Sequence, residues 1–429
     1  MARFLFVSVG ASGHVNPMLS MTAELVRRGH YVGFGTSRHL EPKVTPDVSR
    51  FYSIGPDVGP GSQDKPEWAK FAELRGQRRM KFAIREILFP LAEIATKELL
   101  VIIDSFKPDV LVFDFMTFAA SIVGDLTRLP WATTTPVPGM LQGKDAHPFG
   151  LALPYSETPL RRLYSPLFWH LANATMSYQH DRQFNRIRAG FGLSPVRNAF
   201  FTSSMSPYLV LALAPSEVEY PRSAWPPAVH FVGPAIAIGS AHAQVPEWLE
   251  ALPSSRPLVY ATVGTSPNPG HAPYLERLRA AVGDLDADFV ITVGTGARLP
   301  PSSDNVRIEP WVPNGLIIPK ARMVMHQGGS SSMYETLAHG KPAVVTPFED
   351  GQDENAQRLC WVGAGKMVNP YKVSVRQLRR AIETVLTSKA MQERASSLAE
   401  DLKQYDAGRT GADLLEQLAS KGAPVLASP

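Results

Sequence analysis

The sequence contains very little cysteine, with only Cys360 among its 429 residues. One thiol cannot form an internal disulfide, and it leaves no second thiol for a CxxC redox pair or for a metal site built from cysteines. Such cysteine usage fits a reducing compartment. We therefore expect a cytoplasmic protein without a metal site built from cysteines.

Long hydrophobic runs are missing as well. The first apolar run covers residues 3–9 and ends in a turn that contains Gly10 and Gly13. No later run reaches the roughly 18 residues that a membrane-spanning helix needs. The first run is therefore predicted to be a buried strand and not a signal peptide, and no integral membrane segment is expected.

Basic charge is not concentrated in any long stretch. The formal net charge is +4, and the short basic cluster at residues 75–81 is typical of a solvated helix face. A protein that binds nucleic acid usually presents a larger basic patch. We therefore predict no nucleic-acid partner.

Length and composition favour two domains. Apolar residues make up 44% of the chain, so each half can bury a core of its own. The pattern predicts a first domain over residues 1–215, a proline-rich linker over 216–256, a second domain over 257–400, and a C-terminal helix and tail over 401–429.

The first domain is predicted to be a Rossmann-like α/β domain. The sequence begins with a βαβ unit: an apolar strand, a glycine turn, a helix predicted at residues 17–28 and a second strand. Pro17 is expected in the first turn of this helix. Residues 136–201 are predicted to be an insertion that either shapes a pocket or only packs helices. The strands are expected at residues 3–9, 31–35, 110–113, 131–135 and 208–213.

The second domain repeats this pattern. Residues 373–418 carry only helical periods, and the strands are expected at residues 257–263, 288–293, 306–308, 323–325 and 343–346. Ligands of parallel α/β folds bind at the carboxyl ends of the strands. Two such domains with facing sheets therefore predict a ligand site in the cleft between them.

A glycine- and serine-rich loop follows one strand of the second domain. Residues 326–335 read HQGGSSSMYE and open a helix. Free N–H groups at a helix start form an anion site, which Gly328 and Gly329 leave open to close approach. Serine hydroxyls add donors, and Glu335 can accept from ribose hydroxyls. A serine-capped helix after a glycine turn is the alternative.

Two further loops are expected at the same sheet edge. Residues 309–314 offer Trp311 and Val312 as a flat pocket for a base, and residues 347–356 offer Gln352, Asp353 and Asn355 to sugar hydroxyls. A core tryptophan and a solvated acidic turn are the simpler alternatives.

The stretch from Trp311 to Ala356 resembles the donor-binding signature of nucleotide-sugar-dependent glycosyltransferases of the GT-B type, which have two Rossmann-like domains. Within that superfamily the chain is most similar to bacterial macrolide and antibiotic glycosyltransferases. The resemblance covers nearly the whole chain. It implies an N-terminal acceptor-binding domain and a C-terminal domain that binds a UDP- or dTDP-sugar as co-substrate, without any cofactor.

The resemblance also implies which residues contact the donor. These residues come from both domains, and the glycines and serines of the loop at residues 326–335 are expected around the diphosphate. The full set is Gly13, Thr265, Trp311, Val312, Asn314, Gly328, Gly329, Ser330, Ser331, Glu335 and Gln352. Asn314 stands where the family usually has Gln.

Two positions depart from the family pattern. The usual phosphate-binding His aligns with Gln327, and the usual sugar-binding Asp aligns with Gly351. His326 and Asp350 are the neighbouring candidates to replace them. Loss of a cationic donor at Gln327 weakens charge neutralisation, and loss of a carboxylate at Gly351 favours a deoxysugar.

The first domain offers a histidine with a carboxylate partner. His14 follows the first strand, and Asp114 follows the strand predicted at residues 110–113. A lone histidine is usually a surface residue, and a lone aspartate is usually a turn residue. Imidazole has a pKa near 6.5 and can take the proton of an acceptor hydroxyl, while an aspartate on its far nitrogen fixes the tautomer.

In the resembled family, the residues at these two places are the general base and its orienting partner. The implied reaction is a direct, inverting and metal-independent displacement at the anomeric carbon, onto a hydroxyl of a small apolar acceptor. We expect a polyketide or similar antibiotic-type acceptor and a monomer or homodimer. A nucleotide-sugar epimerase of the same fold and a non-catalytic partner protein remain as alternatives.

Overall fold

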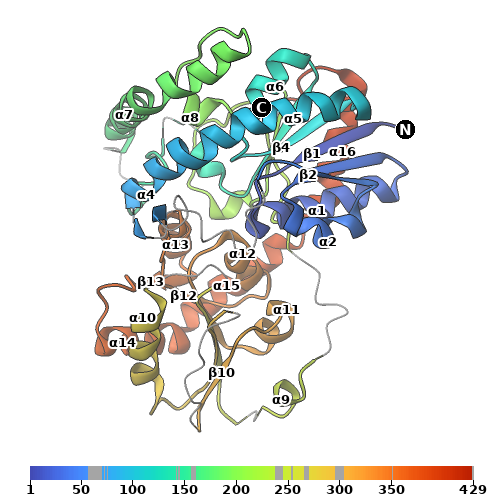
Figure 1. Cartoon of the computed structure of the whole chain (residues 1–429). Helices are drawn as coiled ribbons and strands as arrows, with labels where there is room; N and C mark the ends of the chain where they lie inside the picture. The colour runs from blue at the N-terminus through green and yellow to red at the C-terminus, as the bar shows by residue number, and fades with distance from the viewer. Residues whose placement is uncertain are drawn as a thin grey trace. The chain divides into compact units, whose positions relative to one another are not determined.

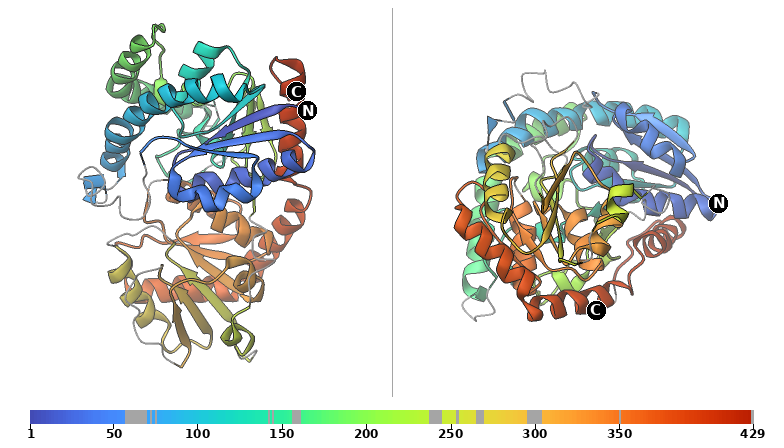
Figure 2. Two further views of the ribbon diagram at one scale, coloured as in Figure 1. Left: turned by 45° about the vertical axis from the view of Figure 1, so that its right-hand side comes forward. Right: turned by 90° about the horizontal axis from the view of Figure 1, so that it is seen from below.

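The computed structural model describes residues 1–56, 70–71, 73–74, 76–141, 143, 145–155, 161–236, 245–252, 255–264, 270–294, 304–349 and 351–427. The chain forms two compact units. Unit 1 comprises Met1–Pro148, Ser156–Ala235 and Tyr405–Pro429, and unit 2 comprises Phe149–Tyr155 and Ile236–Gln404. Each unit is an α/β layer structure around its own parallel sheet, as Figures 1 and 2 show.

Unit 1 is built on a seven-stranded sheet. Every pairing in it is parallel. The spatial order is β3 (Arg50–Ser53), β2 (Tyr31–Thr36), β1 (Arg3–Val7), β4 (Val110–Asp114), β5 (Trp131–Thr135), β6 (Leu209–Ala212) and β7 (Val229–Phe231).

Helices cover both faces of this sheet, which explains why its strands are apolar on both sides. Phe4 and Phe6 of β1 share a core with α1 and α16, while Leu5 and Val7, on the other face, are also buried. The α-helices among the described residues of unit 1 are α1 (Ser12–Arg27), α2 (Glu41–Val44), α4 (Gly76–Phe82), α5 (Phe89–Phe106), α6 (Ala119–Thr127), α7 (Arg161–Gly190), α8 (Ala199–Thr202) and α16 (Ala407–Lys421).

The C-terminal helix α16 is part of unit 1 and packs against α1. Leu415 and Leu418 enter the unit 1 core. Gly411 leaves room for Met21 of α1, since a Cβ there would lie 2.5 Å from Met21 Sδ. At the helix surface, Arg28 Nη1 pairs with Glu416 Oε2 at 2.8 Å. The first unit is therefore completed by the last residues of the chain.

Unit 2 is built on a six-stranded parallel sheet. Its order is β10 (Val306–Glu309), β9 (Asp288–Thr292), β8 (Leu258–Thr262), β11 (Met323–His326), β12 (Ala343–Val345) and β13 (Gly365–Met367). Counted along the chain, this is the 3-2-1-4-5-6 order of a dinucleotide-binding fold. The α-helices are α9 (Glu247–Glu250), α10 (His271–Val282), α11 (Asn314–Ile317), α12 (Ser330–Ala338), α13 (Gln352–Trp361), α14 (Val375–Thr387) and α15 (Lys389–Leu402).

The predicted fold class is confirmed, with differences in detail. Helix α1 begins at Ser12, five residues before the predicted start, so Pro17 lies inside the helix and not in its first turn. Proline has no N–H, so only the hydrogen bond to the Gly13 carbonyl is lost there. The short strands β3, β7 and β13 were not predicted. Among the described residues, no helix is both long and apolar enough to cross a membrane.

Candidate functional site

The structure of unit 1 brings His14 and Asp114 together. His14 lies in the first turn of α1, and Asp114 is the last residue of β4. The register aligns Val7 of β1 with Phe113 of β4, so both loops leave the sheet at the same edge. His14 Nδ1 lies 2.9 Å from Asp114 Oδ1 and 3.1 Å from Oδ2. The predicted pair therefore forms a direct hydrogen bond.

The electrostatics of this pair favour a protonated Nδ1. Burial lowers the pKa of His14, but the charge of Asp114 and its hydrogen bond outweigh burial, so the pKa is raised above 6.5. Asp114 is 2% exposed and His14 is 27% exposed. Asp114 also accepts from the backbone N–H of Met116 at 3.1 Å. With Nδ1–H donated to the carboxylate, Nε2 is the ring nitrogen left to accept a proton.

An apolar hollow in unit 1 is lined in part by the segments that follow β1 and β4. Its volume is about 30 Å³, and it is lined by Val7, Val9, Gly10, Leu91, Met116 and Phe118 among others. That volume holds about one or two water molecules, so only a small group of a ligand fits into the hollow as it stands. The ring of His14 stacks on Phe115 with 5.3 Å between ring centroids. The surroundings of the pair are thus mainly hydrophobic.

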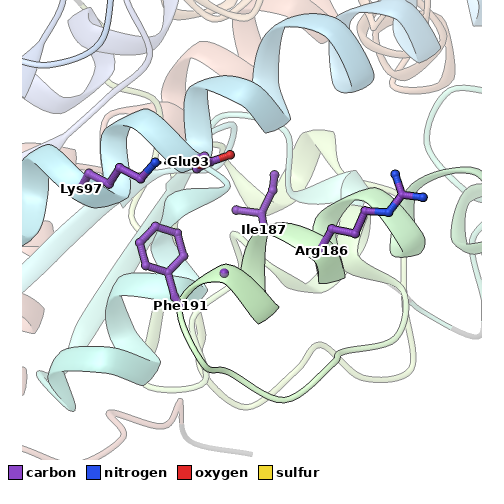
Figure 3. A pocket seen from close by; sticks show the side chains of 6 residues that line it. Glu93, Lys97, Arg186, Ile187 and Phe191 are labelled. Atoms are coloured by element: carbon purple, nitrogen blue, oxygen red, sulfur yellow. Dashed lines mark hydrogen bonds and ion pairs between the residues drawn. The ribbon is translucent and has the colours of Figure 1, made fainter.

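A larger surface hollow in unit 1 contains none of the predicted site residues. It has a volume of about 210 Å³ and is lined by α5 and the end of α7 (Figure 3). Two of its charged groups pair with each other, because Lys97 Nζ donates to Glu93 Oε1 at 2.7 Å. We do not assign the site to this hollow.

The glycine- and serine-rich loop of unit 2 has the form of an anion site. It joins β11 to α12, with Gly329 as the N-cap, so the N–H groups of Ser330 and Ser331 in the first helical turn have no intrahelical acceptor. Gly328 has φ of +96°, and a Cβ there would lie 2.5 Å from the carbonyl oxygen of Gln352. Only glycine fits this turn.

His326 supports the loop from within the core. It is fully buried, and its Nδ1 accepts from the N–H of Gly328 at 3.0 Å. Burial lowers the pKa of His326 to about 4, so the ring is neutral. Its Nε2 has no hydrogen-bond partner among the described residues. His326 therefore fixes the glycine turn and offers no positive charge to a phosphate.

Gln327 lies at the edge of the loop. Its amide fills the space beside Gly264, where a Cβ would lie 2.1 Å from Gln327 Nε2. Its Oε1 is buried without a partner among the described residues. Thr265 and Asp350, predicted to contact the donor, lie outside the described residues.

Glu335 ends a chain of side-chain hydrogen bonds that sequence reasoning missed. Asn314 Nδ2 donates to Glu335 Oε2 at 2.9 Å, and the hydroxyl of Tyr260 donates to Asn314 Oδ1 at 3.1 Å. The same hydroxyl lies 3.2 Å from Thr292 Oγ1. Burial raises the pKa of Glu335, and the bond from Asn314 partly opposes this rise. Tyr260 and Thr292 lie on β8 and β9, and no motif marks them.

The two residues predicted to border a base are placed differently. Trp311 is 59% exposed and presents its ring at the surface of unit 2. Val312 is 2% exposed and packs in a core cluster with Tyr260 and Ile317, so its side chain is not available to a ligand. A flat exposed ring is a stacking surface for a planar group.

Two side-chain amides of the acidic loop, residues 347–356, form hydrogen bonds with backbone groups. Gln352 Oε1 accepts from the N–H groups of Phe348 and Glu349 at 2.9 and 3.0 Å. Asn355 Nδ2 donates to the carbonyl of Gly328 at 2.8 Å. Gly351 has φ of +86° and is the N-cap of α13. The two amides therefore brace the loops, and the part of the chain described holds no cluster of three or more possible metal ligands.

Comparisons with known proteins agree with this architecture. Residues 4–124 match the glycosyltransferase family 28 N-terminal domain, and residues 276–408 match the C-terminal domain of erythromycin biosynthesis protein CIII-like proteins. The chain is 31% identical to 4'-demethylrebeccamycin synthase of Lentzea aerocolonigenes over 419 residues, which are 97% of this chain and 99% of that protein. It is 24% identical to demethyllactenocin mycarosyltransferase of Streptomyces fradiae, over 99% of this chain and 88% of that protein.

Solved structures show the same fold. The glycotransferase of kitacinnamycin superposes with a TM-score of 0.76 at 20% identity, over 97% of this chain and 98% of that one. The calicheamicin glycosyltransferase superposes with a TM-score of 0.75 at 19% identity, over 99% and 100%. These comparisons give no support to a nucleotide-sugar epimerase.

Proposed function

Because the chain belongs to the natural-product glycosyltransferases with the GT-B fold, we propose that it transfers a sugar from a UDP- or dTDP-sugar to a hydroxyl of a small apolar acceptor. The observation that carries this proposal is the bond from His14 Nδ1 to the Asp114 carboxylate. It orients an imidazole whose Nε2 is free to act as a base. The named relatives are a synthase and a transferase, so the protein is an enzyme.

In the proposed reaction, His14 Nε2 removes the proton of the acceptor hydroxyl while the hydroxyl oxygen attacks the anomeric carbon of the donor sugar. The bond from that carbon to the phosphate oxygen breaks, and the nucleoside diphosphate leaves with the electron pair. Attack from the face opposite the leaving group inverts the anomeric configuration. Asp114 stabilises the imidazolium that forms, as in other oriented-base sites.

The loop between β11 and α12 is the proposed binding site of the diphosphate. The N–H groups and hydroxyls of Ser330 and Ser331 at the start of α12 supply donors for the negative charge, which the helix dipole further stabilises. These donors suffice for a metal-independent reaction in this proposal. Glu335 would accept from the ribose, and the exposed ring of Trp311 would stack on the base.

The proposed acceptor is an antibiotic-type compound with an apolar body. Two features support this: the hydrophobic residues beside His14 and Asp114, and the antibiotic names of the similar proteins. An apolar surface removed from water contributes roughly 25 cal/mol per Å². A weakly polar acceptor would therefore bind beside the base without needing many hydrogen bonds.

The decisive experiment separates binding from transfer. We expect His14→Ala to keep donor-induced thermal stabilisation and to lose product formation by at least about a hundredfold, the range of general-base catalysis. Product would be measured by mass spectrometry with several donors and apolar acceptors. His39→Ala is the control, because this histidine lies in the short 3-10 helix Arg38–Leu40, after β2. Unchanged turnover in the His14 variant would remove the proposed base.

A further inference from the structure

A seven-residue segment of the chain belongs to unit 2 although the residues before and after it belong to unit 1. Phe149–Tyr155 leaves unit 1 after Pro148, and the chain returns to unit 1 at residue 156. Within unit 2 the segment contacts α13, the helix that follows the acidic loop. Neither motif nor periodicity predicts this placement.

A buried carboxylate on α13 holds the segment. Glu354 is 1% exposed, and its Oε1 accepts from the N–H groups of Gly150 and Ala152 at 2.7 and 2.8 Å. Its Oε2 accepts from Arg358 Nη1 at 3.1 Å. Gln357 Nε2 donates to the carbonyl of Ala152 at 3.1 Å. A carboxylate at this depth needs such partners, because an unpaired buried charge is strongly destabilising.

The backbone of the segment is shaped around this carboxylate. Gly150 and Ala152 both have positive φ angles, +95° and +47°. The left-handed region costs free energy in alanine, since its Cβ approaches the following carbonyl. Two charge-assisted hydrogen bonds converging on one oxygen offset that cost. Tyr155 adds an edge-on contact to Trp361, with 5.3 Å between ring centroids.

The held segment brings an aromatic ring against the N-cap of α13. A Cβ on Gly351 would lie 3.2 Å from Phe149 Cζ, and φ of +86° also disfavours any residue with a side chain there. A carboxylate at position 351 is therefore disfavoured by the backbone and crowded by the ring. Phe149 occupies the direction in which such a side chain would extend.

We propose that residues 149–155 form a wall of the donor-sugar subsite, that Glu354 is the positioning residue that holds this wall, and that Phe149 makes the subsite select sugars with fewer hydroxyl groups. This inference rests on the proposed function and on the family resemblance, which aligns Gly351 with the usual sugar-binding Asp. An aromatic ring gives apolar contact to C–H groups but leaves a buried hydroxyl without a partner. A deoxysugar avoids that loss.

The first arm of the test measures whether Glu354 holds the segment. The variant Glu354→Leu/Arg358→Met replaces both buried charges by apolar side chains, which usually preserves folding. Hydrogen exchange at the amides of Gly150 and Ala152 should become faster by about tenfold or more, as expected for loss of a hydrogen bond to a charged group. Glu383→Leu/Arg379→Met removes an exposed pair of the same spacing on α14 and is the control.

The second arm measures donor selectivity. In Phe149→Ala, the ratio of kcat/KM for a dTDP-dideoxysugar to that for dTDP-glucose should fall by about tenfold, the scale of one lost apolar contact. The pair variant at positions 354 and 358 should lower this ratio in the same direction. Tyr178→Ala, at a fully solvated ring on α7, should leave the ratio unchanged.

The outcomes separate this inference from the proposed function. Faster exchange together with a lower selectivity ratio supports the inference. An active wild-type protein whose ratio is unchanged in Phe149→Ala overturns the inference alone. Unchanged exchange in the pair variant overturns the role of Glu354. A wild-type protein that transfers no sugar from any donor overturns the proposed function, and the inference with it.

Discussion

Replacing Asp114 by asparagine tests the proposed base most sharply. In the wild-type protein, the Asp114 carboxylate accepts hydrogen bonds from His14 Nδ1–H and from the N–H of Met116. An asparagine has one acceptor oxygen and one donor NH₂ group. If the oxygen keeps the Met116 bond, the NH₂ group faces Nδ1, which must then accept. That tautomer carries its proton on Nε2, so the fraction of rings that can take a proton from the acceptor falls.

The size of the effect follows from the burial of the pair. Asp114 is 2% exposed, so its bond to His14 is little screened by solvent. A hydrogen bond to a charged group contributes about 1.5–3 kcal/mol, and each 1.36 kcal/mol in a barrier changes the rate tenfold. We therefore expect Asp114→Asn to lower kcat/KM by roughly 10- to 200-fold. Donor binding should change little, since the proposed diphosphate site is in unit 2.

The pH dependence gives a second, independent readout. Asp114 raises the pKa of His14, so the variant should have a lower pKa, and the acid limb of its kcat/KM profile should move to lower pH. The raised pKa of His14 also makes the free energy of unfolding depend on pH. A raised histidine pKa stabilises the folded state below the unfolded pKa, and this contribution is lost as pH rises through the folded pKa. The variant should therefore lose more thermal stability at acidic pH than at alkaline pH.

The assay is a set of initial-rate profiles between pH 5 and 9 for wild type, Asp114→Asn and a control. Asp109→Asn is the matched control, because Asp109 accepts from the N–H of Arg3 at 2.7 Å at the other end of the same strand. Its profile should equal that of wild type. An Asp114→Asn enzyme with a rate within about twofold and an unmoved acid limb would refute the base assignment, because every general-base step depends on that pKa.

Three further substitutions test the donor site. Glu335→Ala should weaken donor binding about 10- to 100-fold by calorimetry, through lost ribose acceptors; an unaltered dissociation constant would contradict the assignment. Trp311→Ala should weaken binding of the nucleoside diphosphate alone by about 1–3 kcal/mol through lost stacking, with unfolding nearly unchanged because the ring is 59% exposed. Gly328→Ala should destabilise the protein by more than about 1 kcal/mol in chemical unfolding, since φ is +96° and Gln352 blocks the Cβ; equal stability would show that the turn relaxes.

Much of the fold could be predicted from short apolar runs. Runs of three to five buried residues, separated by segments with helical periodicity, indicate parallel strands, and β1, β4 and β8 were found where expected. Strands β7 and β13 have only three residues each, too few to show a pattern. The start of α1 was missed because glycine and proline normally mark a loop, whereas here they lie inside the helix.

The pairing of His14 with Asp114 was predictable from topology, because adjacent parallel strands end at one sheet edge. The directions in which the side chains point were not predictable from the sequence. Val312 turns into the core and Asn355 turns onto the glycine loop, although both belong to the recognised motif. A motif specifies which residues are near a ligand, but packing decides which of their atoms face it. The hydrogen-bonded link from Tyr260 through Asn314 to Glu335 has no sequence signal. Tyr260 lies 54 positions before Asn314, and Glu335 lies 21 positions after it.

The return of α16 to the first sheet affects how such enzymes can be recombined. Leu415 and Leu418 complete the core around β1 and α1, and Glu416 pairs with Arg28. A hybrid that takes its N-terminal part from one relative and everything after residue 235 from another would combine α1 with a foreign partner helix. Exchange of residues 236–404 as a cassette, with residues 405–429 kept from the N-terminal parent, retains the native helix pair.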